Sequence, residues 1–496
     1  MTAVLPVQTD VTTTPTQTPG AVAPPPAPKM PTAHINQFGG FHKGVSLLHG
    51  WLPLTIEIVA MVLLIIAIVR LTRRWWYIRL PIAVVLGVAG ALAGWWYTNN
   101  QGLASDPAPL LLWISVGLMV GSIAVAVIGW PRARWWQRVA AILAIPFAVA
   151  STAMVINQWV GYYPTVQSAW SAFTAGPLPH QTDLADLAGM RDTNPKTGVI
   201  VPVDIPDTAS GFQHRTEYVY LPPAWFAGKT PPSMPAVLMI GGEFNTPGDW
   251  MRSGEIMPAI DKFTAANSGQ APILVFADSG GSFNNDTECV NGPRGNAADH
   301  LTKDVVPYVE KTFNVSADPA HWAVVGWSMG GTCAVDLTVM HPEQFHTFVD
   351  IAGDVGPDSG TKDQTVTRLY GGNEALWEQF DPMTVMQKHG QYTGIAGLYD
   401  DLTATHFDRS KLPKGFTMPK VSEDQIGKGG QDDMGGGGNS EVGAAEKLCA
   451  ENKKVGIECT IHTTQGGHTW QFAEAAFDSS LAWVTARVGL PVPANS

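Results

Sequence analysis

One serine of the chain stands in a pattern that is typical of an enzyme nucleophile. Ser328 is the central residue of Gly326-Trp327-Ser328-Met329-Gly330, which fits G-x-S-x-G. The apolar segment WAVV precedes this pattern, and a helix-like segment, GGTCAVDLTVMHP, follows it. A strand, a sharp turn and a helix in this order form a nucleophile elbow, where the helix N-terminus favours negative charge. We therefore predict that Ser328 is a nucleophile rather than a small residue in a tight turn.

A serine hydroxyl needs a base to become a good nucleophile. Six histidines follow Ser328 in the sequence, namely His341, His346, His389, His406, His462 and His468. His468 lies in TTQGGHTWQF, a glycine-rich turn between the last expected strand and the final expected helix. That position exposes its imidazole at the carboxyl edge of a parallel sheet, where the serine must also lie. We predict that His468 is the base.

The acid that orients the base is expected at the end of an intervening strand. The segment GIAGLYDD ends in Asp400 and Asp401, which gives the order Ser, Asp, His of α/β-hydrolases. We predict Asp400, three residues after a glycine, with Asp401 as the alternative. Three later acids, Asp432, Asp433 and Glu441, stay in reserve because some hydrolases draw their acid from a later loop.

An oxyanion needs two backbone N–H donors. The amide of Met329, directly after the nucleophile, supplies one of them in this prediction. The second is expected in GGEFNTPGDW, the loop after the apolar segment AVLMI, with the amide of Glu243 as the donor. Glycines in that loop let the backbone approach a substrate closely.

The elements that must position these residues form an α/β pattern. From about residue 195 to 496, short apolar segments such as PAVLMIGG, APILVFAD and FHTFVDIAG alternate with helix-like stretches such as AADHLTKDVVPYVEKTF. Such alternation predicts a largely parallel sheet with helices on both faces. The glycine-rich segment 427–440 is either a solvated linker or an active-site lid. We place the α/β domain at 196–496, after a linker at 164–195.

The N-terminal part is of a different kind. Residues 1–45 are rich in Thr, Pro and Ala and are expected to be disordered. Four apolar segments follow, beginning at Trp51, Leu80, Pro109 and Val139, and each is near the roughly 20 residues that cross a bilayer. Their only acid is Glu57. We predict an all-α transmembrane region of four helices over residues 46–163.

Charge in the connections predicts the orientation. Seven arginines lie in the first and third connections: Arg70, Arg73, Arg74, Arg79, Arg132, Arg134 and Arg138. The second connection, TNNQGLASDPAP, has no Lys or Arg. Loops rich in Lys and Arg tend to lie on the cytoplasmic side of the membrane. The first and third connections are therefore expected in the cytoplasm and both termini outside. The chain is then a multi-pass protein of the cell membrane with its α/β domain extracytoplasmic.

Charge and cysteine content agree with such a protein. With 42 acidic and 30 basic residues the net charge is −12, which argues against a nucleic-acid-binding protein. All four cysteines, Cys289, Cys333, Cys449 and Cys459, fall in the α/β region. An even count suits two disulfides in an oxidising compartment, whereas four buried thiols would suit a cytosolic domain.

Residues 200–490 resemble the esterase family that includes esterase D and the mycobacterial mycolyltransferases. The resemblance rests on the MIGG loop followed by a Trp, on GWSMGG and on GGHTW. It implies an α/β-hydrolase fold, a Ser, Asp or Glu, His triad, and action on acyl esters or acyl transfer between sugars. The chain differs from the secreted mycolyltransferases in its four-helix anchor and in lacking their acidic start to the oxyanion loop.

The resemblance also bears on the cysteines. The segments TECV and GGTCA are similar to cysteine segments of actinobacterial family members, which implies a Cys289–Cys333 pair. Cys449 and Cys459 are close in the chain and would form the second pair. Four cysteines allow three connectivities, and the sequence alone does not rank them.

Together these features predict a membrane-anchored serine esterase or acyltransferase that needs no metal or organic cofactor. The acyl donor is expected to be an envelope lipid or acylated glycan, since the anchor holds the site near the cytoplasmic membrane. Transfer of a mycolyl-type acyl chain to sugars is one alternative. A sugar- or protein-binding module with an esterase fold, and a transporter with an accessory domain, are two others.

Overall fold

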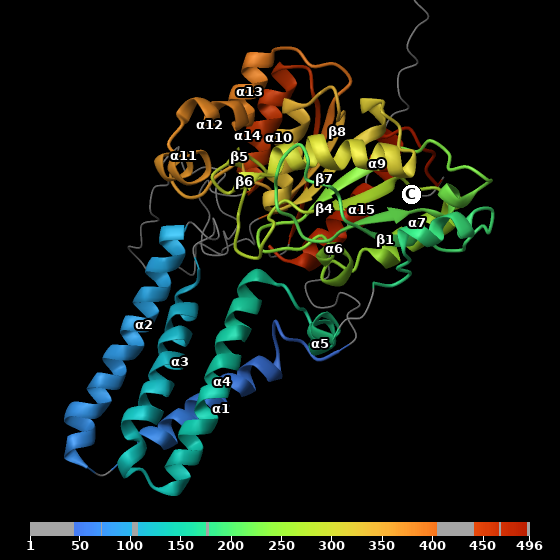
Figure 1. Cartoon of the computed structure of the whole chain (residues 1–496). Helices are drawn as coiled ribbons and strands as arrows, with labels where there is room; N and C mark the ends of the chain where they lie inside the picture. The colour runs from blue at the N-terminus through green and yellow to red at the C-terminus, as the bar shows by residue number, and fades with distance from the viewer. Residues whose placement is uncertain are drawn as a thin grey trace, which may run out of the picture.

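The computed structural model of the chain describes residues 44–70, 72–101, 108–174, 178–403, 441–465 and 468–493. The expected tail, apart from residues 44 and 45, lies outside these ranges, as does the glycine-rich segment 427–440 with the reserve acids Asp432 and Asp433. Figure 1 shows a helical region and an α/β domain joined at one end of the helices.

Four helices are long and apolar enough to cross a membrane. They are α1 (Trp51–Ile68), α2 (Leu80–Gln101), α3 (Leu110–Gly129) and α4 (Trp135–Val160). Three begin within one residue of the predicted positions. The helix α4 begins four residues before Val139, where the side chain of Gln137 accepts a hydrogen bond from the Arg134 amide at 3.0 Å. This contact caps the helix and extends it into the arginine-bearing connection.

The helices pack through small residues, as bilayer helices commonly do. A Cβ added to Gly87 of α2 would lie 2.6 Å from the carbonyl oxygen of Gly117 in α3, so the two backbones approach closely. At one end of the bundle the Arg70 guanidinium donates to the carbonyl oxygen of Gly129 at 2.5 Å. The first and third connections are therefore neighbours.

The α/β domain contacts the opposite end of the bundle (Figure 1). The Arg368 guanidinium donates to the carbonyl oxygen of Asn99, near the end of α2, at 2.6 Å. The chain leaving α4 also packs against the domain, where Tyr162 joins its core. The arginine-bearing connections and the α/β domain thus lie at different ends of the helices.

The α/β domain is built on an eight-stranded sheet, ordered β1-β2-β4-β3-β7-β8-β9-β10. The strands are β1 (Val199–Val203), β2 (Glu217–Leu221), β3 (Ala236–Ile240), β4 (Ile273–Ala277), β7 (Trp322–Trp327), β8 (Thr347–Ile351), β9 (Ala396–Thr403) and β10 (Glu458–Gln465). The pairs β1–β2 and β2–β4 are antiparallel, and the other pairs are parallel. The expected α/β-hydrolase-type sheet after a four-helix region is confirmed.

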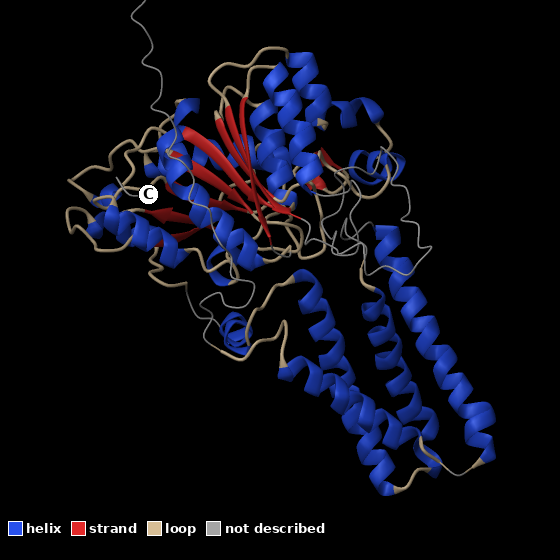
Figure 2. Ribbon diagram, turned by 180° about the vertical axis from the view of Figure 1, so that it is seen from behind, coloured by secondary structure: helices blue, strands red, loops and turns tan. Residues whose placement is uncertain are grey.

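Helices cover both faces of this sheet (Figure 2). One face carries α7 (Met257–Ala266) and α15 (Trp470–Arg487). The other carries α9 (Val306–Phe313), α10 (Met329–Met340) and α14 (Glu441–Lys454). The remaining helices are short: α5 (Val166–Thr174), α6 (Asp249–Arg252), α8 (Ala297–Asp299), α11 (Lys362–Tyr370), α12 (Glu374–Phe380) and α13 (Pro382–His389), beside a small hairpin of β5 (Asn291–Gly292) and β6 (Gly295–Asn296).

Both expected disulfides are present. Cys289 and Cys333 are joined with their Cα atoms 5.7 Å apart, and Cys449 and Cys459 with theirs 5.6 Å apart. The first bond ties the loop before β5 to α10, five residues after Ser328. The second joins α14 to β10, the strand that leads toward His468.

Candidate active site

Ser328 occupies a strained turn between β7 and α10. Its backbone has φ 58° and ψ −124°, a conformation that residues other than glycine seldom adopt. A Cβ at Gly326 would lie 1.7 Å from the carbonyl oxygen of Gly330, and one at Gly330 would lie 2.3 Å from that of Ile240. Side chains at these two positions are therefore excluded. The turn has the geometry of the predicted nucleophile elbow.

His468 lies beside the serine hydroxyl. Its Nε2 atom is 2.9 Å from Ser328 Oγ, within hydrogen-bond reach for proton transfer. The imidazole also packs against the indole of Trp327, with ring centroids 4.2 Å apart. The residue before the nucleophile thus helps to orient the base. The structure brings together the two residues that the sequence paired.

The loop after β3 lies against the serine. A Cβ added to Gly242 would be 3.0 Å from Ser328 Cβ, and the Gly242 amide donates to the side-chain oxygen of Asn245 at 2.8 Å. The 241–250 loop therefore adjoins the nucleophile, as expected of an oxyanion loop. Met329 begins α10 directly after Ser328. The assignment of the Met329 and Glu243 amides as oxyanion donors stays a prediction.

A half-buried ion pair braces this loop, and no sequence pattern indicated it. The Arg215 guanidinium contacts both carboxylate oxygens of Asp278, at 2.9 and 2.5 Å, and donates to the carbonyl oxygen of Asn245 at 2.8 Å. Although burial opposes ionisation, Arg215 holds the pKa of the Asp278 carboxyl below its ordinary value. No local motif marks these residues, because they are far apart in sequence.

The structure does not place Asp400 beside His468. Among the described residues, the Asp400 carboxylate lies 3.0 Å from His462 Nδ1 and accepts from the Ser479 hydroxyl at 3.3 Å. Ser479 is nine residues past Trp470 in α15, which is about 13 Å along the helix axis. His468 stands before that helix, so Asp400 faces the middle of α15 rather than the base.

The other candidate acids are less constrained. Asp401 is buried and belongs to the same strand, but successive strand residues point to opposite faces, so it faces away from Asp400. Glu441 is the first residue of α14. The identity of the orienting acid stays open between Asp400 and Asp401, and the contacts of Asp400 with His462 and Ser479 favour a structural role for Asp400.

Replacing Asp400 with asparagine is expected to lower stability more than activity. The Asp400 carboxylate raises the pKa of His462, against the opposing effect of burial. A raised folded-state pKa means that the ion pair stabilises the fold fully below about pH 6.5 and less as the pH rises through the folded pKa. The midpoint temperature of thermal unfolding of Asp400→Asn should therefore lie furthest below that of the wild type near pH 6. The difference between the two midpoints should become smaller by pH 9.

Esterase assays on Asp400→Asn and Asp401→Asn decide the catalytic question. We expect kcat of Asp400→Asn to stay within about tenfold of wild type. Loss of the orienting acid of a triad lowers kcat by about 10⁴-fold. A loss of that size in Asp400→Asn would reinstate it as the acid, and a loss confined to Asp401→Asn would select the alternative.

A second cluster of titratable groups lies at the antiparallel side of the sheet. The ligand-type atoms of His214, Glu217 and His300 all lie within 4.8 Å of one another. Glu217 Oε1 is 3.1 Å from His300 Nε2 and accepts from the Asp278 amide at 2.9 Å. The two ring nitrogens of His214 face the carbonyl oxygens of Ile205 and Arg215, at 2.6 and 2.9 Å.

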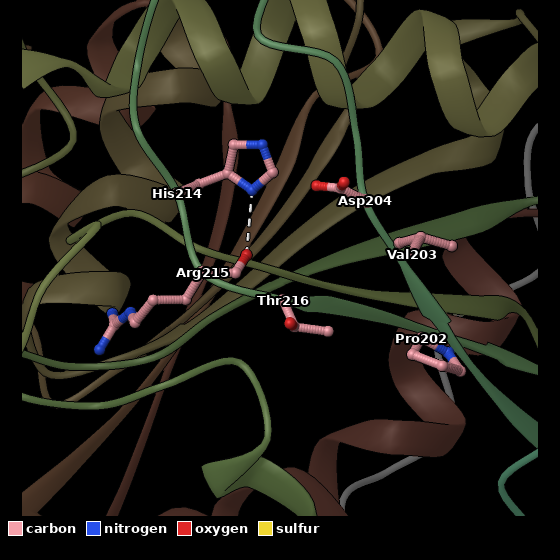
Figure 3. A pocket seen from close by; sticks show the side chains of 6 residues that line it. All are labelled: Pro202, Val203, Asp204, His214, Arg215 and Thr216. Atoms are coloured by element: carbon pink, nitrogen blue, oxygen red, sulfur yellow. Dashed lines mark hydrogen bonds between the residues drawn. The ribbon is translucent and has the colours of Figure 1, made fainter.

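These contacts make His214 a poor metal ligand. Each of its nitrogens serves as a donor to a carbonyl oxygen, which leaves no lone pair for a metal ion. Although burial opposes the charge, the Arg215 carbonyl oxygen and Glu217 raise the pKa of His214. Figure 3 shows this imidazole at the wall of a 590 Å³ pocket, with its hydrogen bond to the Arg215 carbonyl. We therefore interpret the cluster as a structural set of polar contacts that supports the Arg215–Asp278 ion pair.

Comparison with known proteins shows that this chain is similar to esterases. Residues 212–406 match the family model described as “Putative esterase”. An uncharacterized protein of Corynebacterium glutamicum is 27% identical over 396 residues, covering 78% of this chain and 84% of that protein. Because 78% exceeds the share of residues 196–496, that match extends into the region before the α/β domain.

Two solved structures illustrate the similarity to known folds. A ferulic acid esterase covers 59% of this chain and 98% of its own, at 17% identity and a TM-score of 0.41. An S-formylglutathione hydrolase from Agrobacterium tumefaciens covers 60% and 97%, at 17% identity and a TM-score of 0.42. Likenesses this distant carry no inference about substrate.

Proposed function

We propose that the chain is a membrane-anchored serine esterase or acyltransferase. Its residues 212–406 match the family model described as “Putative esterase”, which supports a hydrolase. Its substrates would be acyl esters of an envelope lipid or an acylated glycan outside the cytoplasmic membrane. The observation that carries this proposal is the 2.9 Å contact between Ser328 Oγ and His468 Nε2 at a strained strand-to-helix turn.

The proposed reaction has two halves. Ser328 Oγ attacks the ester carbonyl carbon while His468 Nε2 takes the hydroxyl proton. The resulting oxyanion would accept hydrogen bonds from the amides of Met329 and Glu243. Collapse then breaks the ester C–O bond, and the leaving alcohol takes the proton from His468. Water or a sugar hydroxyl attacks the acyl-enzyme by the reverse route, which gives either hydrolysis or transfer.

The experiment that tests this proposal uses the full chain in membranes. A fluorophosphonate probe should label the wild-type protein at Ser328, and incubation with envelope lipid extracts should release or move an acyl group. Peptide mapping of the labelled protein identifies the site. A protein that neither reacts with the probe nor processes an acyl ester would contradict the proposed function.

The proposed location predicts which loops are exposed outside the cell. All four native cysteines are in disulfides, so an introduced cysteine is the only free thiol. We expect a membrane-impermeant maleimide to label Asn100→Cys in intact cells and Ala133→Cys only after permeabilisation, because Ala133 lies among the arginines of the third connection. Labelling with the reverse pattern would place the α/β domain in the cytoplasm.

A further inference from the structure

We propose that Tyr162, two residues past the end of α4, is a positioning residue for the 241–250 loop. In this proposal α4 helps to hold the active site in place and does not only anchor the chain. This inference rests on the proposed function, in which that loop binds the oxyanion. It assigns a role to the membrane helices that the sequence left open.

The exit from α4 has a defined shape. Gly161 ends the helix in the left-handed conformation, with φ 62°. The buried side chain of Asn157 then bonds both backbone groups of Tyr163: its Nδ2 donates to the carbonyl oxygen at 2.8 Å, and its Oδ1 accepts from the amide at 2.7 Å. Tyr162 stands between Gly161 and Tyr163, whose backbones are fixed by these contacts, so its side chain is held in one direction.

Tyr162 reaches the loop through its hydroxyl. The hydroxyl donates to Asp249 Oδ2, and the ring packs against the core of the α/β domain. Burial and the neighbouring Asp249 carboxylate raise the pKa of Tyr162, so the hydroxyl stays protonated and acts as a donor. The contact is therefore a charge-assisted hydrogen bond between the end of a membrane helix and the α/β domain.

Asp249 links the Tyr162 hydroxyl to other residues of the loop by hydrogen bonds. Its Oδ2 atom also accepts from the amide and hydroxyl of Thr246, at 2.6 and 2.8 Å. Thr246 follows Asn245, whose side-chain oxygen accepts a hydrogen bond from the amide of Gly242 at 2.8 Å. Gly242 in turn lies against Ser328. Asp249 and Thr246 are thus tied to the Tyr162 hydroxyl directly or by one hydrogen bond, and Asn245, next to Thr246, holds Gly242.

A second contact reaches the base from the same turn. A Cβ added to Gly161 would lie 2.4 Å from Thr469 Cγ2, and Thr469 directly follows His468. The next residue, Trp470, packs edge-on against Trp250 at the end of the loop, with ring centroids 5.3 Å apart. The exit of α4 therefore touches both the loop beside the nucleophile and the segment that carries the base.

The test compares Tyr162→Phe with Tyr97→Phe in the full chain, reconstituted in liposomes and assayed with p-nitrophenyl butyrate. Both variants lose one hydroxyl, but Tyr97 is a half-exposed residue of α2. We expect kcat of Tyr162→Phe to fall on the order of 10- to 100-fold with KM unchanged, because displaced catalytic groups cost such factors. The rate of fluorophosphonate labelling should fall in parallel, and Tyr97→Phe should match wild type.

A glycine pair tests the second contact. Gly161→Ala should also lower kcat relative to the wild type, because the added methyl group would displace Thr469. Gly50→Ala is the matched control, because Gly50 also has a positive φ, 93°, but has nothing within 4 Å of the added methyl group. A Tyr162→Phe enzyme with kcat within twofold of Tyr97→Phe would overturn the positioning role alone. A wild-type protein that neither turns over the ester nor reacts with the probe would overturn both proposals.

Discussion

Replacement of Ser328 by alanine is expected to abolish fluorophosphonate labelling and to lower kcat/KM for an acyl ester by about 10⁴- to 10⁶-fold. The residual rate would come from oxyanion stabilisation and substrate binding, which survive the loss of the nucleophile. The effect should be confined to chemistry, because the Ser328 side chain makes its hydrogen bond with His468 and alanine keeps the Cβ atom. Labelling with the probe, followed by ester hydrolysis kinetics, measures both expectations.

The matched control is Ser282→Ala. Ser282 is an exposed serine in the loop after β4, so its loss should leave labelling and turnover unchanged. The midpoint temperatures of thermal unfolding of both variants should stay close to that of the wild type. Persistent labelling of Ser328→Ala would show that another residue is the nucleophile, and the proposed chemistry would then be wrong at its first step.

The elbow was predictable because its information is local. The φ of 58° at Ser328 forces glycines two residues away on each side, and the apolar strand and following helix are contiguous with them. His468 was predictable for a similar reason, since a glycine-rich turn between the last strand and last helix must lie at the carboxyl edge of the sheet. The four apolar helices likewise follow from composition alone.

The acid was harder because it depends on which way a strand residue points. Asp400 and Asp401 are adjacent, and the motif places both near the end of β9. Only the folded structure shows that the Asp400 carboxylate contacts His462 of β10 and Ser479 of α15. The sequence contains no local signal for that contact, since Ser479 is 79 residues away.

The supports of the 241–250 loop lie outside the reach of any local motif. Arg215 lies 30 residues before Asn245 and braces the loop through it, while Tyr162 belongs to a different region of the chain. Their common feature is a half-buried polar group that contacts a carboxylate or carbonyl oxygen of the loop. Polar side chains that are removed from water need partners, so a tyrosine just past a long apolar helix, in a chain with an esterase motif, is the signal to examine in similar sequences.

The second large effect is expected for His468→Ala. Removing the base leaves Ser328 as an ordinary hydroxyl, so kcat should fall by about 10⁴- to 10⁶-fold and the probe should react much more slowly. His462→Ala is the matched control, because His462 contacts Asp400 instead of Ser328. That variant should lose stability below about pH 6.5 and keep most of its activity.

Double replacement separates a working pair from two independent residues. Groups that act as one unit are strongly non-additive, so Ser328→Ala with His468→Ala should be no slower than Ser328→Ala alone. Independent contributions would instead multiply the two losses. Rate constants that multiplied, or a His468→Ala enzyme as fast as His462→Ala, would show that the 2.9 Å contact between Ser328 and His468 is not the one that transfers the proton. The single and double variants, assayed with one soluble ester, therefore test whether the base was correctly identified.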